Sequence, residues 1–215
     1  MRAWERIADK SHPEGQPHIY TEGDNWRFNM HMVDRDGYTE NTDRQRQEVA
    51  GCRVDDSYLR WLSGETWRIT YSMYLPKSLK ATTKGSHIMQ IKKPGTTLPL
   101  AVQSLRRKDG QQMIELNSVA SNTIIGRTAL EPLHDKWTDV DFRITIGNGK
   151  SGSIRWTLAS DGTTVIDVAR DGIDTLSKGE RAYPRWGIYR YLDDDSGSLE
   201  DCYMLLTNPR AYQLI

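Results

Sequence analysis

Short runs of the chain alternate apolar and polar residues, so that every second side chain within such a run is hydrophobic. Within 65–75, for example, the apolar positions are Trp67, Ile69, Tyr71, Met73 and Leu75. A repeat of two predicts half-buried β-strands, because successive side chains of a strand point to opposite faces. By this rule we expect strands at 26–33, 65–75, 86–92, 98–105, 112–117, 140–147, 154–160, 163–168, 185–191 and 201–206.

Turn signals separate these segments. Asp161-Gly162 is the strongest, and it predicts a hairpin that joins 154–160 to 163–168. The only helix-like candidate is 57–62, which is too short to define a class. Neither internal repeats nor a low-complexity linker divides the chain. We therefore expect one all-β domain, 1–215, built from two stacked antiparallel sheets.

Composition narrows the choice of partners. The 215 residues include 29 Lys and Arg against 29 Asp and Glu, so the formal net charge is zero. This balance excludes the global basic field that drives non-specific nucleic-acid binding, and an anionic partner must be met by a local patch. No apolar run is long enough to span a membrane. Seven Trp and ten Tyr against two Phe fit either sugar stacking or ordinary strand packing.

Three local features stay open at this point. Residues 1–6 lack the apolar core of a signal peptide, which fits either a cytosolic protein or a mature form given a start Met. Cys52 and Cys202 form either one disulfide or two buried thiols. The stretch 193–197, Asp-Asp-Asp-Ser-Gly, is either a solvated turn or a calcium loop, and a Ca²⁺ there would be structural.

Two polar segments carry candidate chemistry. If 43–49 is a strand, Arg44, Arg46 and Glu48 project from one face, and Glu48 can hold a guanidinium bidentately while the other cation meets a ligand carboxylate. In 86–92, parity places Gln90 and Lys92 on one face with Ile88, and His87 on the opposite face. Taken singly, each pattern is equally typical of a solvated outer face.

The third polar segment, 183–191, is rich in tyrosine. Its parity aligns Arg185, Gly187, Tyr189 and Tyr191 on one face and places Arg190 on the other. A glycine beside Tyr189 would leave room for a ligand to approach the phenol.

Together these segments resemble the motif set of the jelly-roll polysaccharide lyases, which include glucuronan, alginate and heparin-type lyases. That family has an Arg-x-Glu strand, a Gln-Ile-His or Gln-Trp-His strand and a late Lys-x-Gly-x-Tyr strand. Here the motifs stand, in the same order, as 46–48 (Arg-Gln-Glu), 90–92 (Gln-Ile-Lys) and 185–190 (Arg-Trp-Gly-Ile-Tyr-Arg). Two positions depart from the pattern, since Lys92 replaces the family histidine and Arg185 the family lysine.

The resemblance implies a concanavalin-like β-jelly-roll sandwich that cleaves a uronic-acid polysaccharide by β-elimination. The stretch 67–76 resembles the glucuronan- and heparin-lyase branch, which favours glucuronan as substrate, with alginate next. The resemblance also implies a secreted or periplasmic monomer that needs no cofactor. Its partner is then an anionic polysaccharide, with no nucleic acid and no membrane.

By the same resemblance, Gln90 and Arg46 neutralise the C6 carboxylate, with Lys92 in place of the family histidine. Tyr189 acts as base and acid, and Glu48 orients Arg46. Because an ordinary phenol has a pKa of about 10, we expect a cation, Arg185 or Lys92, beside Tyr189.

Three more residues complete the expected set of site residues. His31 lies on the polar face of 26–33 and is the candidate to fill the place of the missing histidine. Arg44 and Tyr191 would extend the substrate-binding surface.

Two other functions remain open. A carbohydrate-binding module or lectin on the same sandwich would explain the aromatic surplus without any chemistry. A glycoside hydrolase would need two carboxyl groups about 5–9 Å apart, and Glu48 and Glu115 are the candidates.

Overall fold

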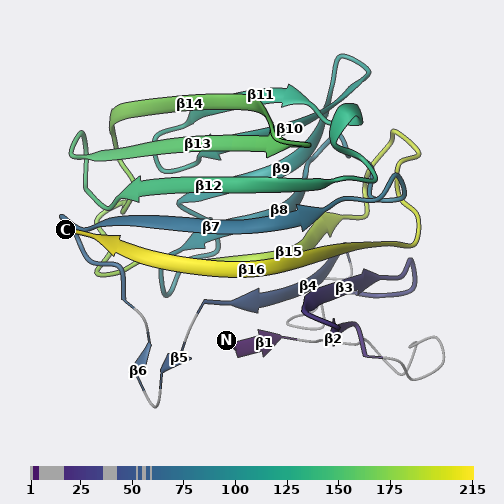
Figure 1. Cartoon of the computed structure of the whole chain (residues 1–215), viewed down its shortest axis with the longest axis horizontal. Coiled ribbons are helices and arrows are strands. Elements are labelled where there is room, and N and C mark those ends of the chain that lie inside the picture. The colour runs from purple at the N-terminus through teal and green to yellow at the C-terminus, as the bar shows by residue number, and fades with distance from the viewer. Residues whose placement is uncertain (1, 5–16, 36–42, 52, 55–56, 59) are drawn as a thin grey trace.

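The computed structural model describes residues 2–4, 17–35, 43–51, 53–54, 57–58 and 60–215. Two seven-stranded sheets stack face to face, with sheet B in front of sheet A in Figure 1. Sheet A has the order β1 (Arg2–Trp4), β4 (Arg44–Ala50), β15 (Tyr183–Tyr191), β8 (Ser86–Lys92), β9 (Ala101–Lys108), β10 (Gln111–Ser118) and β11 (Thr123–Ala129). Sheet B has the order β14 (Thr163–Ile173), β13 (Gly152–Ser160), β12 (Trp137–Thr145), β7 (Thr66–Tyr74), β16 (Cys202–Leu214), β3 (Asn25–Met30) and β2 (Ile19–Glu22).

Every strand pair within these two sheets is antiparallel, so the predicted all-β jelly-roll sandwich of two antiparallel sheets is confirmed. The core lies between the sheets and follows the predicted parity. In β7, for example, burial alternates along the whole strand, and Ile69 stands opposite the fully buried Phe142 of β12. Burying each such side chain contributes roughly 1.5–3 kcal/mol.

The predicted hairpin is also present. Asp161 and Gly162 join β13 to β14, and their φ angles are 51° and 73°. A type I′ turn needs positive φ at both central residues, which explains why Asp-Gly predicted it.

The helix-like candidate 57–62 is not helical over its described residues. Ser57 and Tyr58 form strand β6, which pairs with β5 (Arg53–Val54), and Trp61 exchanges backbone hydrogen bonds with Ala182. So short a segment cannot repay the cost of helix nucleation, whereas pairing uses its backbone groups at once. Within the described part of the chain, helical structure is confined to a short 3₁₀ turn, Glu131–Leu133.

The described ranges contain no helix with the length and apolar character needed to cross a membrane. Cys202 is a free, buried thiol that accepts a hydrogen bond from Arg190. Cys52 lies outside the described residues.

Candidate active site

Strands β4 and β15 lie side by side in sheet A and bring two of the predicted segments together. Tyr189 stands directly opposite Arg46, and directly opposed residues share a face of the sheet. The alternate residues, such as Val49 and Ile188, belong to the core. The outer face of these strands therefore carries Arg44, Arg46, Glu48, Arg185, Tyr189 and Tyr191.

Strand β8 adds the third segment on the other side of β15. Gln90 stands opposite Arg185, and Lys92 stands opposite Tyr183. Gln90 and Lys92 therefore share the outer face with the arginines and tyrosines, as their parity predicts. Both side chains are almost fully covered, with 3% and 6% exposure.

A β-bulge at Ile88 changes the phase of β8 and brings His87 to the same outer face. His87 pairs with Ser104 of β9, and Met89 pairs with the next residue, Gln103, so Ile88 has no partner across the ladder. On the other side, His87 pairs with Tyr189. The His87 and Tyr189 rings meet edge to face with 5.4 Å between their centroids.

The bulge makes two predictions for this strand wrong. Ile88 and Met89 are consecutive, yet both are buried in the core, whereas parity had placed Ile88 beside Gln90. His87, expected on the opposite face, joins Gln90 at the site. An extra residue in a strand reverses the alternation of side chains for the residues before it. A prediction that assumes an uninterrupted period of two cannot detect this reversal.

Gly187 does not leave a gap for a ligand, contrary to the prediction. Its φ is 137°, and a Cβ on this residue would lie 2.0 Å from the backbone oxygen of Gln47 and 2.8 Å from the Cα of Glu48. The neighbouring strand β4 fills the space. The glycine therefore allows the two backbones to approach each other.

Glu48 lies at the centre of the cluster with 1% exposure. Gln90 Nε2 donates a hydrogen bond to Glu48 Oε1, while Arg46 Nε and Arg185 Nη1 each lie 3.8 Å from Oε2. The expected bidentate grip of Glu48 on a guanidinium is therefore absent. Instead, Glu48 fixes the amide of Gln90 and compensates two cations at once.

The phenol of Tyr189 is contacted by cations, but not by those that the sequence had suggested. Arg44 Nη1 donates to Tyr189 Oη at 3.1 Å, and the Arg46 guanidinium lies 4.3 Å from the ring centroid. Arg185 instead donates to Tyr183 Oη, and Lys92 donates to the Thr97 carbonyl oxygen. Arg44 and Arg46 are therefore the cations that contact the hydroxyl and the ring of Tyr189.

Asp43 and Tyr191 support this arrangement. Asp43 accepts hydrogen bonds from Arg44 Nε and Nη2 at 2.8 and 2.9 Å, and this contact raises the pKa of the Arg44 guanidinium. The Tyr191 ring lies under Arg44 and 5.7 Å from the Tyr189 ring. Burial raises the pKa of Tyr191, as does its hydrogen bond with Tyr189.

Burial and like charges lower the pKa of two basic groups in the cluster. The pKa of His87 falls to about 4, first because of burial and then because of Arg106, Arg46 and Lys92. The pKa of Lys92 falls to about 8, again through burial first and then Arg185. At neutral pH, His87 is therefore uncharged and Lys92 remains a cation.

His31 does not fill the place of the missing histidine. It follows β3 in sheet B, where its ring lies 3.4 Å from an Asp201 carboxylate oxygen and 5.3 Å from the His18 ring. It makes no described contact with Gln90 or Tyr189. Because β3 belongs to the opposite sheet, the polar parity that singled out His31 concerns the outer face of sheet B.

The two carboxylates of the hydrolase alternative are too far apart. Glu48 is on β4 and Glu115 on β10, four strand steps away in sheet A, or roughly 19 Å at about 4.8 Å per step. Glu115 is also held by Arg106 at 2.9 Å and by Arg127 at 2.6 Å. This pair cannot act on one glycosidic bond.

Carboxylates of the acidic loop 193–197 bind other residues of the protein. Asp194 accepts hydrogen bonds from Thr83 and Ser196, and Asp193 pairs with Lys84. Over the described residues, no group of three or more His, Cys, Asp or Glu is placed to hold a metal ion.

Comparison with known proteins relates the fold of this chain to solved structures. No family model matches the chain, and no curated protein matches it. Among solved structures, an endo-β-1,4-glucuronan lyase from the fungus Trichoderma reesei has 14% sequence identity and a TM-score of 0.58, and the match covers 100% of this chain and 96% of that one.

Alginate lyases are also similar. Alginate lyase AlgAT5 of polysaccharide lyase family 7 has 13% identity and a TM-score of 0.60, with 95% of this chain and 84% of that one covered. Alginate lyase A1-II′ of family 7, in complex with its substrate GGMG, has 17% identity and a TM-score of 0.59, with 91% and 81% covered. The chain therefore has the jelly-roll fold of the polysaccharide lyases.

Proposed function

We propose that the protein is a polysaccharide lyase that cleaves a uronic-acid polymer by β-elimination. One observation carries the proposal: Tyr189, with Arg44 on its hydroxyl, converges with Gln90 and Arg46 on the outer face of sheet A. A simple binding surface needs flat, exposed aromatic rings. It does not need a 7%-exposed phenol held between two guanidinium groups.

β-Elimination begins at the C6 carboxylate, which must be neutralised before the C5 proton becomes acidic. Arg46, Lys92 and the amide of Gln90 are the donors that the cluster offers, and Glu48 holds that amide in place. Donors fixed in advance stabilise the negative charge that develops in the enolate-like transition state. Arg185 and Lys92 add positive potential beside this position.

Proton transfer then involves Tyr189. Arg44 donates to the phenol oxygen, so the oxygen can carry negative charge or give up its own proton while its position stays fixed. Tyr191 and Arg44 extend the surface for the neighbouring sugar units. The proposed reaction uses side chains alone, so we propose no cofactor.

For the substrate we propose glucuronan first and alginate next. The match with the glucuronan lyase covers nearly all of both chains, whereas the alginate lyases extend further beyond this chain. With a polymeric substrate we also propose that the protein acts as a monomer outside the cytoplasm.

A panel of uronate polymers tests the proposal. The protein is incubated with glucuronan, alginate and sulfated glycosaminoglycans, and the ultraviolet absorbance of the new C4–C5 double bond is followed. We expect turnover on at least one polymer. Tyr189→Phe should lower the rate at least about 100-fold while polymer binding is kept, because acid–base catalysis typically contributes this much.

The exposed Tyr212 of β16 in sheet B provides a matched control, and Tyr212→Phe should leave the rate unchanged. Full turnover by the Tyr189 variant would refute the assignment of the site.

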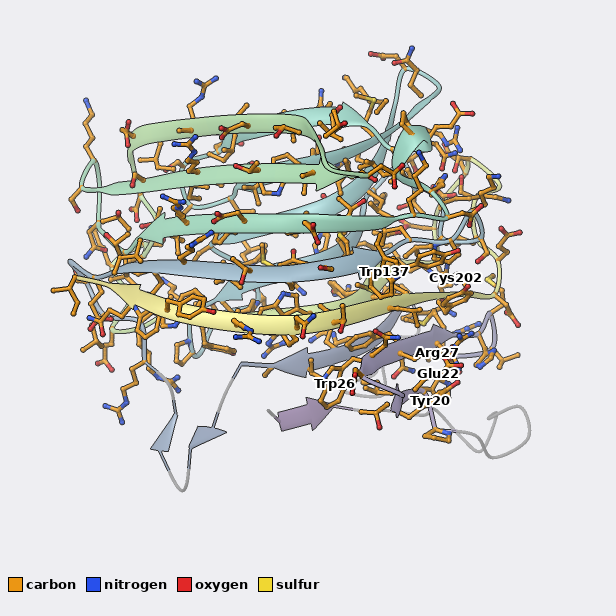
Figure 2. All side chains as sticks on the ribbon, viewed as in Figure 1. Tyr20, Glu22, Trp26, Arg27, Trp137 and Cys202 are labelled. Carbon is orange, nitrogen blue, oxygen red and sulfur yellow. The ribbon has the colours of Figure 1, made fainter. Side chains whose placement is uncertain are left out.

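A second candidate function is carbohydrate binding without chemistry. It is favoured by an aromatic row on the outer face of sheet B, where Trp137 is 40% exposed (labelled in Figure 2) and lies 5.7 Å from the Tyr74 ring. Tyr203 continues the row, 6.5 Å from Tyr74. Binding with no unsaturated product from any polymer would favour this function over the lyase.

A further inference from the structure

We propose that His87 accepts the C5 proton in the elimination, which leaves Tyr189 to protonate the departing O4. The inference rests on the proposed lyase function and deepens it. It assigns a catalytic role to a histidine that lies outside the Gln-Ile-Lys segment and reaches the site only through the bulge at Ile88.

The first support is position. Strand pairing places His87 opposite Tyr189 on the outer face, and the two rings are in edge-to-face contact. Gln90 shares this face, three residues along the same strand. A uronate whose carboxylate meets Gln90 and whose O4 meets Tyr189 therefore has its C5 near both rings.

The second support concerns Nδ1 of the His87 ring; the ring also has a hydrogen bond with the Gln90 side chain. His87 Nδ1 is buried and has no hydrogen-bond partner, while the residue keeps partial exposure. A buried polar atom without a partner is costly and is explained if a ligand or a reaction uses the ring.

The third support is charge state. The charged groups that face His87 are Arg46 from β4, Arg106 from β9 and Lys92 from its own strand, and Tyr189 packs against it from β15. Burial first, and then these cations, lower the pKa of His87 to about 4, against the opposing effect of its hydrogen bond with the Gln90 side chain. The imidazole therefore has a free lone pair at neutral pH.

The other basic groups are less suited to accept the proton. Lys92, with a pKa of about 8, is still protonated at pH 7. Tyr189 Oη accepts from Arg44, which leaves its own O–H free to donate. The neutral imidazole and the phenol thus form an acceptor and a donor side by side.

The step balances without any additional reactant. The C5–H bond breaks, its proton goes to the imidazole nitrogen of His87, and its electron pair forms the C4–C5 double bond. The C4–O4 bond breaks with its electrons on O4, which takes the phenolic proton of Tyr189. Transfer of the proton from His87 back to the Tyr189 oxygen, through solvent, restores the starting state.

The first experiment compares His87→Asn with His31→Asn on the polymer that the wild-type protein cleaves best. Asparagine keeps a polar side chain of similar reach but is not a base. We expect the His87 variant to lose about 100-fold or more in kcat with KM changed less than threefold. The His31 variant, altered in sheet B, should keep the wild-type kcat.

The second experiment separates chemistry from structure. His87→Ala should be inactive, and added imidazole should restore activity in proportion to its free-base concentration, because the small base occupies the space of the lost ring. A structural role would not respond to a diffusible base. Tyr189→Phe should show no such rescue.

The outcomes are distinguishable. If the wild-type protein cleaves no uronate polymer, the proposed function fails. If it cleaves one and the His87 variants retain kcat within threefold, the lyase stands and the role of His87 is refuted. Loss of activity without imidazole rescue, or a loss confined to KM, also overturns the role as proton acceptor.

Discussion

The outer faces of the two sheets both carry paired arginines and carboxylates, but these side chains are exposed on sheet B and buried around Glu48 on sheet A. On sheet B, arginines pair with aspartates in the solvent: Arg155 and Asp167 lie 2.6 Å apart with 52% and 39% side-chain exposure. Arg27 and Glu22 form another such pair, at the edge that Figure 2 labels. On sheet A, Glu48 and Arg185 keep only 2% and 7% side-chain exposure, and their charged atoms stay 3.8 Å apart.

The difference shows what solvent does to a charged face. An exposed ion pair is screened by solvent and contributes about 0–1 kcal/mol to stability. The pKa of Asp167 is lowered first by its hydrogen bond with Arg155. On sheet A, burial is the first cause of the lowered pKa values of His87 and Lys92, and neighbouring cations add to it. Such tuning by burial and like charge is typical of sites that perform chemistry.

The largest expected effect concerns the free energy of unfolding. Glu48→Gln leaves Arg46, Arg185 and Lys92 without their shared buried carboxylate, which should cost about 3–5 kcal/mol. Asp167→Asn, the matched change on sheet B, should cost less than about 1 kcal/mol. Urea unfolding at pH 7 measures both, and equal losses would show that the two faces do not differ.

The next effect depends on pH. With a pKa of about 4 in the folded protein and 6.5 as the reference, His87 binds a proton more readily in the unfolded chain. Its contribution to stability is therefore complete above pH 6.5 and is lost as the pH falls toward 4, by about 3 kcal/mol.

The free energy of unfolding is measured for the wild-type protein and for His87→Asn between pH 7 and pH 4. The difference between the two proteins gives the contribution of His87, because the contributions of other titrating groups cancel. The variant should gain stability relative to the wild type as the pH falls. A difference that does not change with pH would mean that His87 titrates normally.

The smallest effect concerns polymer affinity. Arg127 of β11 uses Nε and Nη2 on Glu115, and its side chain is 26% exposed on the same face as Tyr189. Arg127→Gln should weaken binding of a uronate polymer about fivefold, or ~1 kcal/mol, and less at high salt. Arg155→Gln on sheet B should leave the affinity unchanged, and titration calorimetry at two salt concentrations compares them.

Parity along single strands predicted much of this architecture. It placed Arg46 and Tyr189 on outward faces and Ile69 and Phe142 in the core, because each strand keeps its alternation unbroken there. It failed at His87, where one extra residue reverses the alternation. The cation on the Tyr189 hydroxyl was also missed, because Arg44 reaches it from a strand more than a hundred residues away.

The alternation and turn signals of the amino-acid sequence were enough to predict a β-sandwich, a hairpin at Asp161-Gly162, and a shared face for Gln90 and Lys92. These are local properties, fixed by side-chain period and turn chemistry. The packing of distant strands, in contrast, places His87 in the site and His31 outside it, and fills the space at Gly187 with β4. Strand order, bulges and burial are settled by packing between distant segments, and they set both the neighbours and the pKa values of the charged groups.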